Sequence, residues 1–319
     1  MKSIDRRQFV GAGIATIAVA GACHFALAQG ENLLSATAGS RIRDKRPTVH
    51  TPGLRFGAYD PHGDFAEQAN VTTEALFMPW EDVDLSSLPA ADAYALQRKR
   101  NLLITVEPWS WDENFRLTSG ELQTRILNGT YDRNMREIAH LIGQMKSPAI
   151  VRWAQEMEDH ESRFSWAGWR PDAYITAYRR MMDIVRKEAP KAQLMWSPKG
   201  VPGLRDYYPG SNYVDYVGLS VFGLEAFDRI AHGNPRSFSD NLLQGYGLVE
   251  EFSKPVWVAE LGYEGGDGYL TAWMGEVTRD REEFPLLEEV VYFNDREVHP
   301  WPYNLGRPDW RVVRTGSLG

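Results

Sequence analysis

The sequence predicts an α/β fold, a single-domain (β/α)8 barrel of the TIM type, from three observations. Eight short apolar or aromatic runs recur along the chain. Amphipathic stretches with the period of a helix separate several of these runs. Without an amino-terminal export signal the chain has about 290 residues, which fits one such barrel, since about 250 residues are typical. A doubly wound open sheet is the alternative, but no Gly-x-Gly-x-x-Gly follows the first run to favour it.

The predicted strands are hydrophobic throughout instead of alternating between apolar and polar residues. Continuous hydrophobicity is what a parallel sheet needs when helices cover it. The strands are expected over residues 54–60, 74–79, 102–109, 149–157, 193–198, 216–222, 255–262 and 289–295. Helices are expected over residues 88–100, 131–145, 172–187, 238–252 and 268–278.

The amino terminus predicts export from a bacterial cell. Arg6 and Arg7 precede an apolar stretch from Phe9 to Ala28, which is typical of a twin-arginine signal over residues 1–28, cleaved after Ala28. An uncleaved membrane anchor and a lipoprotein attached at Cys23 are the alternatives. We expect a periplasmic or secreted protein with no membrane attachment after cleavage.

Composition narrows the class of protein further. Residues 29–52 are polar and basic, so a flexible lead-in is expected there, with the catalytic domain over 53–319. Cys23 is the only cysteine, so the mature chain has no thiol for a disulfide. The formal net charge of −8 argues against nucleic acid as a partner. We expect a monomer.

Two glutamates close two of the predicted strands. Glu156 ends the fourth strand and Glu260 ends the seventh. The carboxyl ends of barrel strands meet at one face, so these two carboxyl groups are expected to converge. A pair of carboxyl groups is what hydrolysis of a glycosidic bond requires.

The chain resembles glycoside hydrolase family 26, the β-mannanase and β-glucanase group, across most of residues 54–312. Residues 152–156 read Arg-Trp-Ala-Gln-Glu and resemble the family's Arg-x-x-His-Glu motif. Residues 254–260 read Lys-Pro-Val-Trp-Val-Ala-Glu and resemble its nucleophile strand. Residues 105–109 and 215–218 fit more loosely. The resemblance implies a member of the retaining (β/α)8 glycosidase clan, with Glu156 as acid/base and Glu260 as nucleophile.

In this interpretation each charged residue has a defined task. Arg152 would favour the ionised form of Glu260 by its charge, while Glu156 starts protonated and donates its proton to the leaving oxygen. A separation of about 5 to 5.5 Å between the carboxyl groups would mean retention of the anomeric configuration. No metal or cofactor is needed.

Other polar and aromatic residues near strand ends are candidates for binding the polysaccharide. Glu107 is expected to bind a sugar hydroxyl or to form a structural ion pair. Asp60 and His62 would hold a sugar or cap the next turn, and Asn294 would reach the site from the eighth strand. Flat aromatic rings suit pyranose faces, or else fill the core. The substrate-binding candidates are Glu107, Trp109, Trp111, Arg152, Gln155, Asp60, His62, Trp166 and Asn294. Strand parity is expected to turn Trp153 and Trp257 toward the helices.

Two residues depart from the family pattern. Gln155 stands where the family usually has histidine, and Phe222 lies near where a tyrosine commonly hydrogen-bonds the nucleophile. Tyr216, Tyr263 or Tyr292 would have to supply that hydroxyl instead.

Three hypotheses on function remain. The leading one is an exported retaining endo-β-glycanase that hydrolyses β-1,4-linked mannan or β-glucan. The second is a catalytically weakened barrel that acts as a polysaccharide-binding or exopolysaccharide-assembly protein. A deacetylase or lyase is the third, although the chain has no His-x-x-x-His and its acidity disfavours the basic cleft of a lyase.

Overall fold

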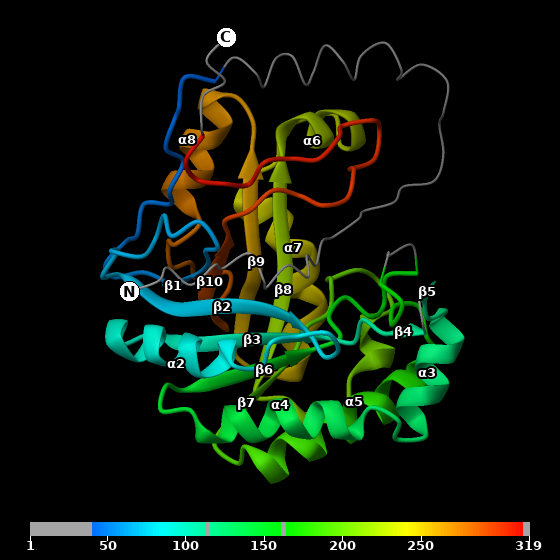
Figure 1. Ribbon diagram of the computed structural model, residues 1–319. Helices are drawn as coiled ribbons and strands as arrows, with labels where there is room; N and C mark the ends of the chain where they lie inside the picture. The colour runs from blue at the N-terminus through cyan, green and yellow to red at the C-terminus, as the bar shows by residue number, and fades with distance from the viewer. Residues whose placement is uncertain (1–39, 113–114, 161–163, 315–319) are drawn as a thin grey trace.

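The barrel is closed and all eight of its strands are parallel. The computed structural model describes residues 40–112, 115–160 and 164–314. Around the barrel the strands follow chain order (Figure 1): β1 (Arg55–Tyr59), β2 (Val71–Pro79), β3 (Asn101–Glu107), β6 (Ala149–Trp153), β7 (Gln193–Trp196), β8 (Tyr216–Leu224), β9 (Val256–Glu264) and β10 (Leu287–Phe293), which pairs with β1. The predicted fold class is confirmed.

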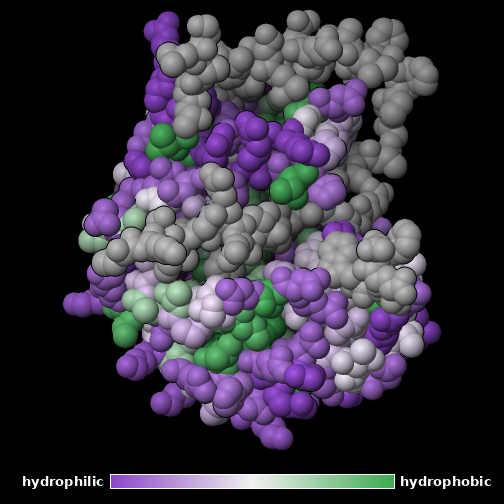
Figure 2. Space-filling model, viewed as in Figure 1, coloured by the Kyte–Doolittle hydropathy of each residue, from purple (hydrophilic) through white to green (hydrophobic). Residues whose placement is uncertain are grey.

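Helices cover the outside of the barrel. Five of them coincide with the predicted ones: α2 (Ser87–Arg98), α4 (Asp132–Gln144), α5 (Pro171–Glu188), α7 (Phe238–Val249) and α8 (Asp267–Glu276). The sequence analysis missed α3 (Ser119–Leu127), α6 (Glu225–Ala231) and a small hairpin of β4 (Trp111–Asp112) with β5 (Phe115–Arg116). Short 3-10 turns span Leu204–Tyr207, Ser211–Tyr213 and Glu250–Phe252. The space-filling view shows a mainly hydrophilic exterior on this face (Figure 2).

Apolar side chains form two layers, one between strands and helices and one inside the barrel. Trp153 belongs to the outer layer, where its ring lies 6.3 Å from that of Tyr174 and 6.2 Å from that of Tyr178, both on α5. Trp257 instead clusters with Phe77 and other interior residues. The parity prediction is therefore confirmed for Trp153 and wrong for Trp257.

A β-bulge in β9 explains the error on Trp257. Val258 pairs with Leu219 of β8, but the next pairing joins Glu260 to Ser220, so Ala259 is the extra residue. A bulge of this kind shifts the alternation of faces by one residue. Trp257 and Ala259 face the interior before the bulge, and Glu260 faces it after the bulge. Without the bulge, strand parity would allow either Trp257 and Ala259 or Glu260 to point inward, but not both.

The described part of the predicted lead-in is packed on the barrel. The sequence predicted a flexible segment over residues 29–52, yet the Lys45 side chain is fully buried. Its ammonium group donates to the Tyr263 carbonyl at 2.8 Å and to Glu264 Oε2 at 2.7 Å. Because a buried ammonium group needs such partners, these contacts hold the segment from Ser40 onward in place.

The predicted signal over residues 1–28 lies outside the described residues. Within the described ranges, no helix combines the length and the hydrophobicity needed to cross a membrane.

Candidate active site

Glu156 and Glu260 lie at the carboxyl end of the barrel and are almost fully excluded from solvent, with 0% and 1% of their surfaces exposed. Glu260 is part of β9, the seventh barrel strand, and Glu156 follows β6, the fourth. The charge of Glu156 raises the pKa of Glu260, so the two carboxyl groups lie close enough to interact. The structure therefore brings the two predicted carboxyl groups into one buried site.

Arg152 joins the two glutamates electrostatically. Its Nη1 atom donates to Glu260 Oε1 at 2.7 Å, and both side chains are fully buried. The same Nη1 lies 3.5 Å from Thr105 Oγ1 of β3. Arg152 is in β6 and Ile150, two residues before it, faces the barrel interior, so strand alternation points the guanidinium inward as well. A buried charge-assisted pair of this kind fixes the orientation of the Glu260 carboxyl group.

Glu156 is held by a bent segment of backbone directly after β6. Ala154 and Glu156 have φ angles of 48° and 57°, a left-handed conformation that residues other than glycine adopt rarely. The Glu156 amide donates to the Ser197 carbonyl at 2.8 Å, and its Oε1 accepts from Ser220 Oγ at 2.6 Å. Backbone strain of this kind clusters at functional sites.

Burial raises the pKa of both glutamates. For Glu260 burial has the largest effect; the Arg152 charge lowers the pKa, and the charges of Glu156 and Glu107 raise it, to about 8. For Glu156 burial again raises the pKa most strongly, against the lowering effects of Lys199, the Ser220 hydrogen bond and Arg152. Because the two groups interact, the site holds a proton at neutral pH as a pair. The direct ion pair with Arg152 favours the negative charge on Glu260 and the proton on Glu156.

Gln155 and Glu107 form a second polar cluster beside the glutamates. Gln155 Nε2 donates to Glu107 Oε1 at 2.8 Å, and Trp109 Nε1 donates to Glu107 Oε2 at 3.1 Å. The side chains of Gln155 and Glu107 are fully buried. Gln155 therefore supplies an N–H donor at the position where the family resemblance implies histidine.

Several buried atoms of the site have hydrogen-bonding capacity that no described protein group uses. They are Oε2 of Glu156, Oε2 of Glu260, Nε and Nη2 of Arg152, and Oε1 of Gln155. Unsatisfied polar atoms inside proteins are rare, and a catalytic role is one of the explanations for them. The arrangement thus offers donors and acceptors to a polar substrate.

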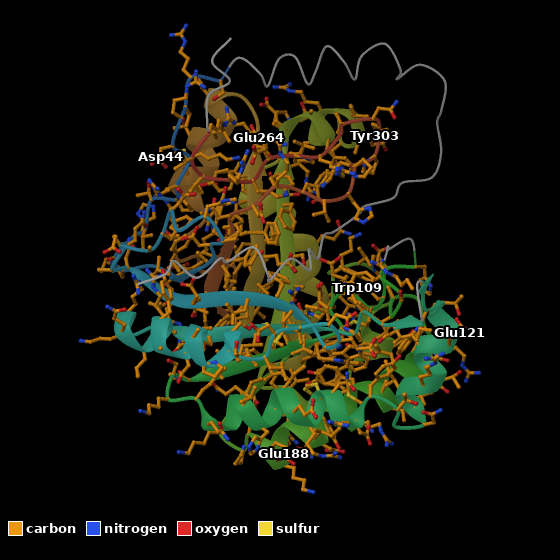
Figure 3. The ribbon with its side chains drawn as sticks, viewed as in Figure 1. Asp44, Trp109, Glu121, Glu188, Glu264 and Tyr303 are labelled. Atoms are coloured by element: carbon orange, nitrogen blue, oxygen red, sulfur yellow. The ribbon has the colours of Figure 1, made fainter. Side chains whose placement is uncertain are left out.

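The predicted aromatic platforms differ in how they are placed. Trp109 lies at the end of β3 beside the β4–β5 hairpin (Figure 3), 6% exposed, with the Arg116 guanidinium 3.9 Å from the centre of its ring. Trp166 is fully buried: it donates to the Gln155 carbonyl at 2.8 Å and stacks on Phe164 at 4.6 Å. Trp166 therefore supports the Gln155 backbone instead of presenting a face to an open subsite. Trp111 is in β4, and its side chain lies outside the described residues.

Asp60 and Asn294 are engaged with each other and with backbone groups. Asp60 accepts from the amides of Asp64 and Phe65 at 3.0 and 2.8 Å, and from Asn294 Nδ2 at 2.7 Å. Asn294 Oδ1 accepts from the Val312 amide at 2.8 Å. These bonds close the turn after β1 and fasten the C-terminal segment, so the turn-capping alternative describes Asp60, and Asn294 does not reach into the site.

His62 lies at the rim of the barrel, where its Nε2 is 3.2 Å from Asp295 Oδ1. The hydrogen bond with Asp295 raises the pKa of His62. Its partly exposed ring is available to a ligand at the rim.

None of the three tyrosines considered from the sequence approaches Glu260. The hydroxyl of Tyr263 donates to the Lys45 carbonyl, that of Tyr292 to the Trp310 carbonyl, and that of Tyr216 to Gln193. Phe222 packs against Trp310, with ring centres 5.0 Å apart. Tyr59 is the tyrosine near the site: burial and the charges of Asp295, Glu107 and Glu260 raise the pKa of its hydroxyl.

Sequence reasoning missed Ser220, Tyr59 and Lys199. Tyr59 is the last residue of β1, so the strand-end rule does mark it, but the sequence predicted no role for it in the site. Ser220 is in the middle of β8, where no terminal signal marks it. Within the described ranges, no group of three or more His, Cys, Asp or Glu side chains is arranged to hold a metal ion.

A family model described as glycosyl hydrolase family 26 matches residues 110–234. This segment includes Glu156 and Ser220 and ends before Glu260. The β-1,3-xylanase TXYA of Vibrio sp is 25% identical over 149 residues, which are 41% of this chain and 31% of that relative. Mannan endo-1,4-β-mannosidase A and B of Caldalkalibacillus mannanilyticus is 26% identical over 165 residues, 47% of this chain and 29% of that relative. The chain spans less than half the length of these curated relatives.

A solved structure shares the fold. The modular endo-β-1,4-mannanase from Cellulomonas fimi superposes with a TM-score of 0.60 at 16% sequence identity, over 85% of this chain and 69% of that chain. This likeness shows a shared barrel fold, and the family model shows that residues 110–234 are similar to glycosyl hydrolase family 26.

Proposed function

We propose that this chain is an exported retaining endo-β-glycanase that hydrolyses β-1,4-linked mannan or β-glucan by double displacement. The observation that carries the proposal is the buried pair of glutamates, one of which is ion-paired with Arg152 at 2.7 Å. Polysaccharide is the substrate class that two such carboxyl groups serve. Relatives that act on mannan and on β-1,3-xylan support the class and leave the sugar to experiment. The twin-arginine motif supports export, to the periplasm or the medium.

The first chemical step needs an ionised Glu260 and a protonated Glu156. Arg152 stabilises the negative charge on Glu260, which attacks the anomeric carbon. Glu156 donates its proton to the leaving oxygen, so the glycosidic bond breaks as the bond to Glu260 forms. Ser220 holds the Oε1 atom of Glu156, which leaves Oε2 to deliver the proton.

The second step reverses the role of Glu156. Once it has lost its proton, it removes one from a water molecule, and the resulting hydroxide displaces Glu260 from the sugar. The product keeps the anomeric configuration of the substrate. Gln155 and Glu107 provide fixed hydrogen-bonding groups for the sugar hydroxyls beside the reacting carbon.

Release of reducing ends from a panel of β-1,4-mannan, barley β-glucan, β-1,4-xylan and β-1,3-xylan tests the proposal. We expect activity on one glycan, reduced about 10²–10⁴-fold by Glu156→Gln, as for removal of a general acid, and at least as strongly by Glu260→Gln. Glu137→Gln, on the exposed face of α4, is the matched control. NMR of the first product anomer separates retention from inversion.

The alternative function is a polysaccharide-binding barrel with weakened catalysis. Phe222 favours it, because the phenyl ring gives Glu260 no hydroxyl partner and packs on Trp310 instead. Binding of one glycan by the wild-type protein without release of reducing ends would select this alternative and contradict the hydrolase.

A further inference from the structure

A pocket adjoins the acid/base side of the site and differs from it in charge. It encloses a volume of about 100 Å³ between the loop after β7, the end of β8 and helix α7. Among the described residues that line it, the ionisable ones are Lys199, His232 and Arg236. Asp and Glu are absent from the described residues that line it, although the whole chain carries a formal net charge of −8.

Ser220 connects this pocket to Glu156. Its side chain lines the pocket, and its hydroxyl donates to Glu156 Oε1 at 2.6 Å. Lys199 also lines the pocket, and its charge acts on Glu156. The leaving part of a substrate lies next to the group that protonates it, so the pocket is where the leaving sugar would extend.

The walls of the pocket combine the surfaces that a pyranose ring needs. Phe222 and Trp301 line it with aromatic rings, and Asn241 and Gln244 of α7 line it with amides. Aromatic faces pack on sugar rings, and amides can donate to and accept from hydroxyls. An uncharged sugar would be satisfied by these groups alone.

An uncharged sugar would need no positive charge in the pocket, yet Arg236 supplies one. Its guanidinium donates to the backbone carbonyl of Asp240. Asp228 and Asp240 interact with the charge of Arg236. Asp228 accepts from the Tyr269 hydroxyl and from the Arg236 backbone amide, at 2.8 and 3.0 Å, and Asp240 caps α7 through Ser237.

The second cation, Lys199, is balanced by Asp159, whose Oδ2 lies 2.6 Å from Nζ. His232 adds an imidazole ring, whose pKa is lowered by burial and by the charge of Arg236. Arg236 is therefore the principal anchor for an anion in the pocket.

We propose that this pocket binds the leaving sugar of the substrate, and that this sugar carries a carboxylate which pairs with Arg236. The inference rests on the proposed function, since it takes Glu156 to be the proton donor. It narrows the substrate from neutral glycans to a β-glycan that contains uronosyl or carboxylate-substituted residues.

Binding of monosaccharide probes tests the inference without turnover. Titrations followed by protein NMR compare D-glucuronate with D-glucose at pH 7. We expect glucuronate to bind at least about tenfold more tightly than glucose. Arg236→Gln should remove that preference, whereas Arg229→Gln, an equal change of charge on neighbouring α6, should leave it intact.

Gln244→Glu provides a second variant, because Gln244 is exposed on α7 and the substitution adds a negative charge to the pocket wall without disturbing the core. It should weaken glucuronate binding at least as much as Arg236→Gln. A methyl glucoside bearing a 4,6-linked pyruvate ketal is the second ligand, and tighter binding of this ketal would place the carboxylate on a substituent.

Equal affinity for glucuronate and glucose, or a preference that survives both substitutions, would overturn the inference. The hydrolysis assay reports separately on the proposed function. Activity on neutral glycans without any preference for glucuronate would support the proposed hydrolase and contradict the proposed role of the pocket. Glucuronate binding that is lost in Arg236→Gln, with no hydrolysis of any neutral or uronate-containing β-glycan, would support a carboxylate site in the pocket but overturn both the hydrolase and the assignment of the bound sugar as its leaving group.

Discussion

Arg152 determines which of the two buried glutamates carries the negative charge. Both carboxyl groups lose hydration, so burial alone would keep both protonated at neutral pH. Arg152 donates to Glu260 and not to Glu156, and this asymmetry separates a nucleophile from an acid. Other charges nearby, those of Lys199 and Asp159, oppose each other at Glu156.

Replacement of Arg152 by glutamine should therefore shift the pH dependence of hydrolysis. Without the guanidinium the pKa of Glu260 rises further above about 8, so the acidic limb of the kcat/KM profile should move to higher pH. At pH 7 we expect kcat/KM to fall at least about 100-fold. Full pH profiles of wild type and variant provide the measurement.

Arg180→Gln is the control for this prediction, because Arg180 forms a partly exposed ion pair with Asp132 away from the site. Its profile should coincide with that of the wild type. A uniform loss of activity in Arg152→Gln, with an unmoved acidic limb, would show that Arg152 acts by supporting the structure alone.

Gln155 offers a second test at the residue scale. Gln155→Leu removes the donor to Glu107 and leaves a buried carboxylate oxygen without it, which costs about 1–3 kcal/mol of stability. Gln155→His retains an N–H donor, so we expect it to preserve the melting temperature and kcat/KM more closely than leucine does. Thermal unfolding and steady-state kinetics of the two variants make the comparison. Equal behaviour of both would mean that the hydrogen bond to Glu107 is not important.

Among the elements, β8 and β9 shape the site because they lie close together at its wall. Gly218 of β8 faces the interior, where a Cβ atom would come within 2.8 Å of Met195 Sδ and Ser197 Oγ and 3.0 Å of Ala259 Cβ. Real Cβ atoms do not approach so closely, so a side chain at this position would force Met195, Ser197 or the strands themselves to shift.

Gly218→Ala should thus destabilise the protein by about 1–3 kcal/mol, as overpacking usually does. Gly247 of α7 is the matched position, since a Cβ atom there would meet nothing within 4 Å. Gly247→Ala should stabilise by up to about 1 kcal/mol through helix propensity. Urea denaturation of both variants measures the difference, and an equal effect of the two substitutions would contradict the packing argument.

The elements also show what a sequence can and cannot predict here. The strand runs and the strand-end rule place Glu107, Arg152, Gln155, Glu156 and Glu260 together, because closure of a parallel barrel brings strand ends to one face. The bulge in β9 has no local signal, so Trp257 was assigned to the opposite face. Helix α3, which was not predicted, did carry a local signal, the capping box of Thr118 and Glu121.

Hydrogen bonds between segments that are distant in the sequence are the second feature that could not be predicted. Asp60 and Asn294 look available in the sequence, yet they bind each other across 234 positions. Trp166 likewise has the composition of a sugar platform, but its indole is committed to the Gln155 carbonyl. Burial and pairing of this kind depend on the closed barrel and cannot be read from local sequence.

Across the whole molecule, acidic groups are buried well beyond the site. Burial raises the pKa of Glu158 to about 7, although it accepts bonds from the Gly200 and Val201 amides. It also raises that of Glu289 to about 7, against the effect of its hydrogen bonds to threonines and of Arg55. These carboxyl groups favour the protonated form in the folded state more than in the unfolded chain.

The free energy of unfolding should therefore decrease as pH rises from about 5 to 8. A carboxyl group whose pKa is raised on folding contributes full stability below its unfolded value near 4.5, and loses that contribution as pH passes its folded value of about 7. For Glu289 alone the loss amounts to about 3 kcal/mol. Urea denaturation at pH 5.5 and pH 8, on wild type and Glu289→Gln, should show about 2 kcal/mol of this loss in the wild type, because the rest has already occurred at pH 5.5. Glutamine cannot ionise, so the variant should flatten the difference. Glu67→Gln is the control: it removes an exposed carboxyl group that lies near Arg98 and away from Glu289, and it should leave the pH dependence unchanged. A wild-type protein equally stable at both pH values, or a Glu289→Gln variant with the wild-type slope, would show that Glu289 is ionised in the folded state at neutral pH.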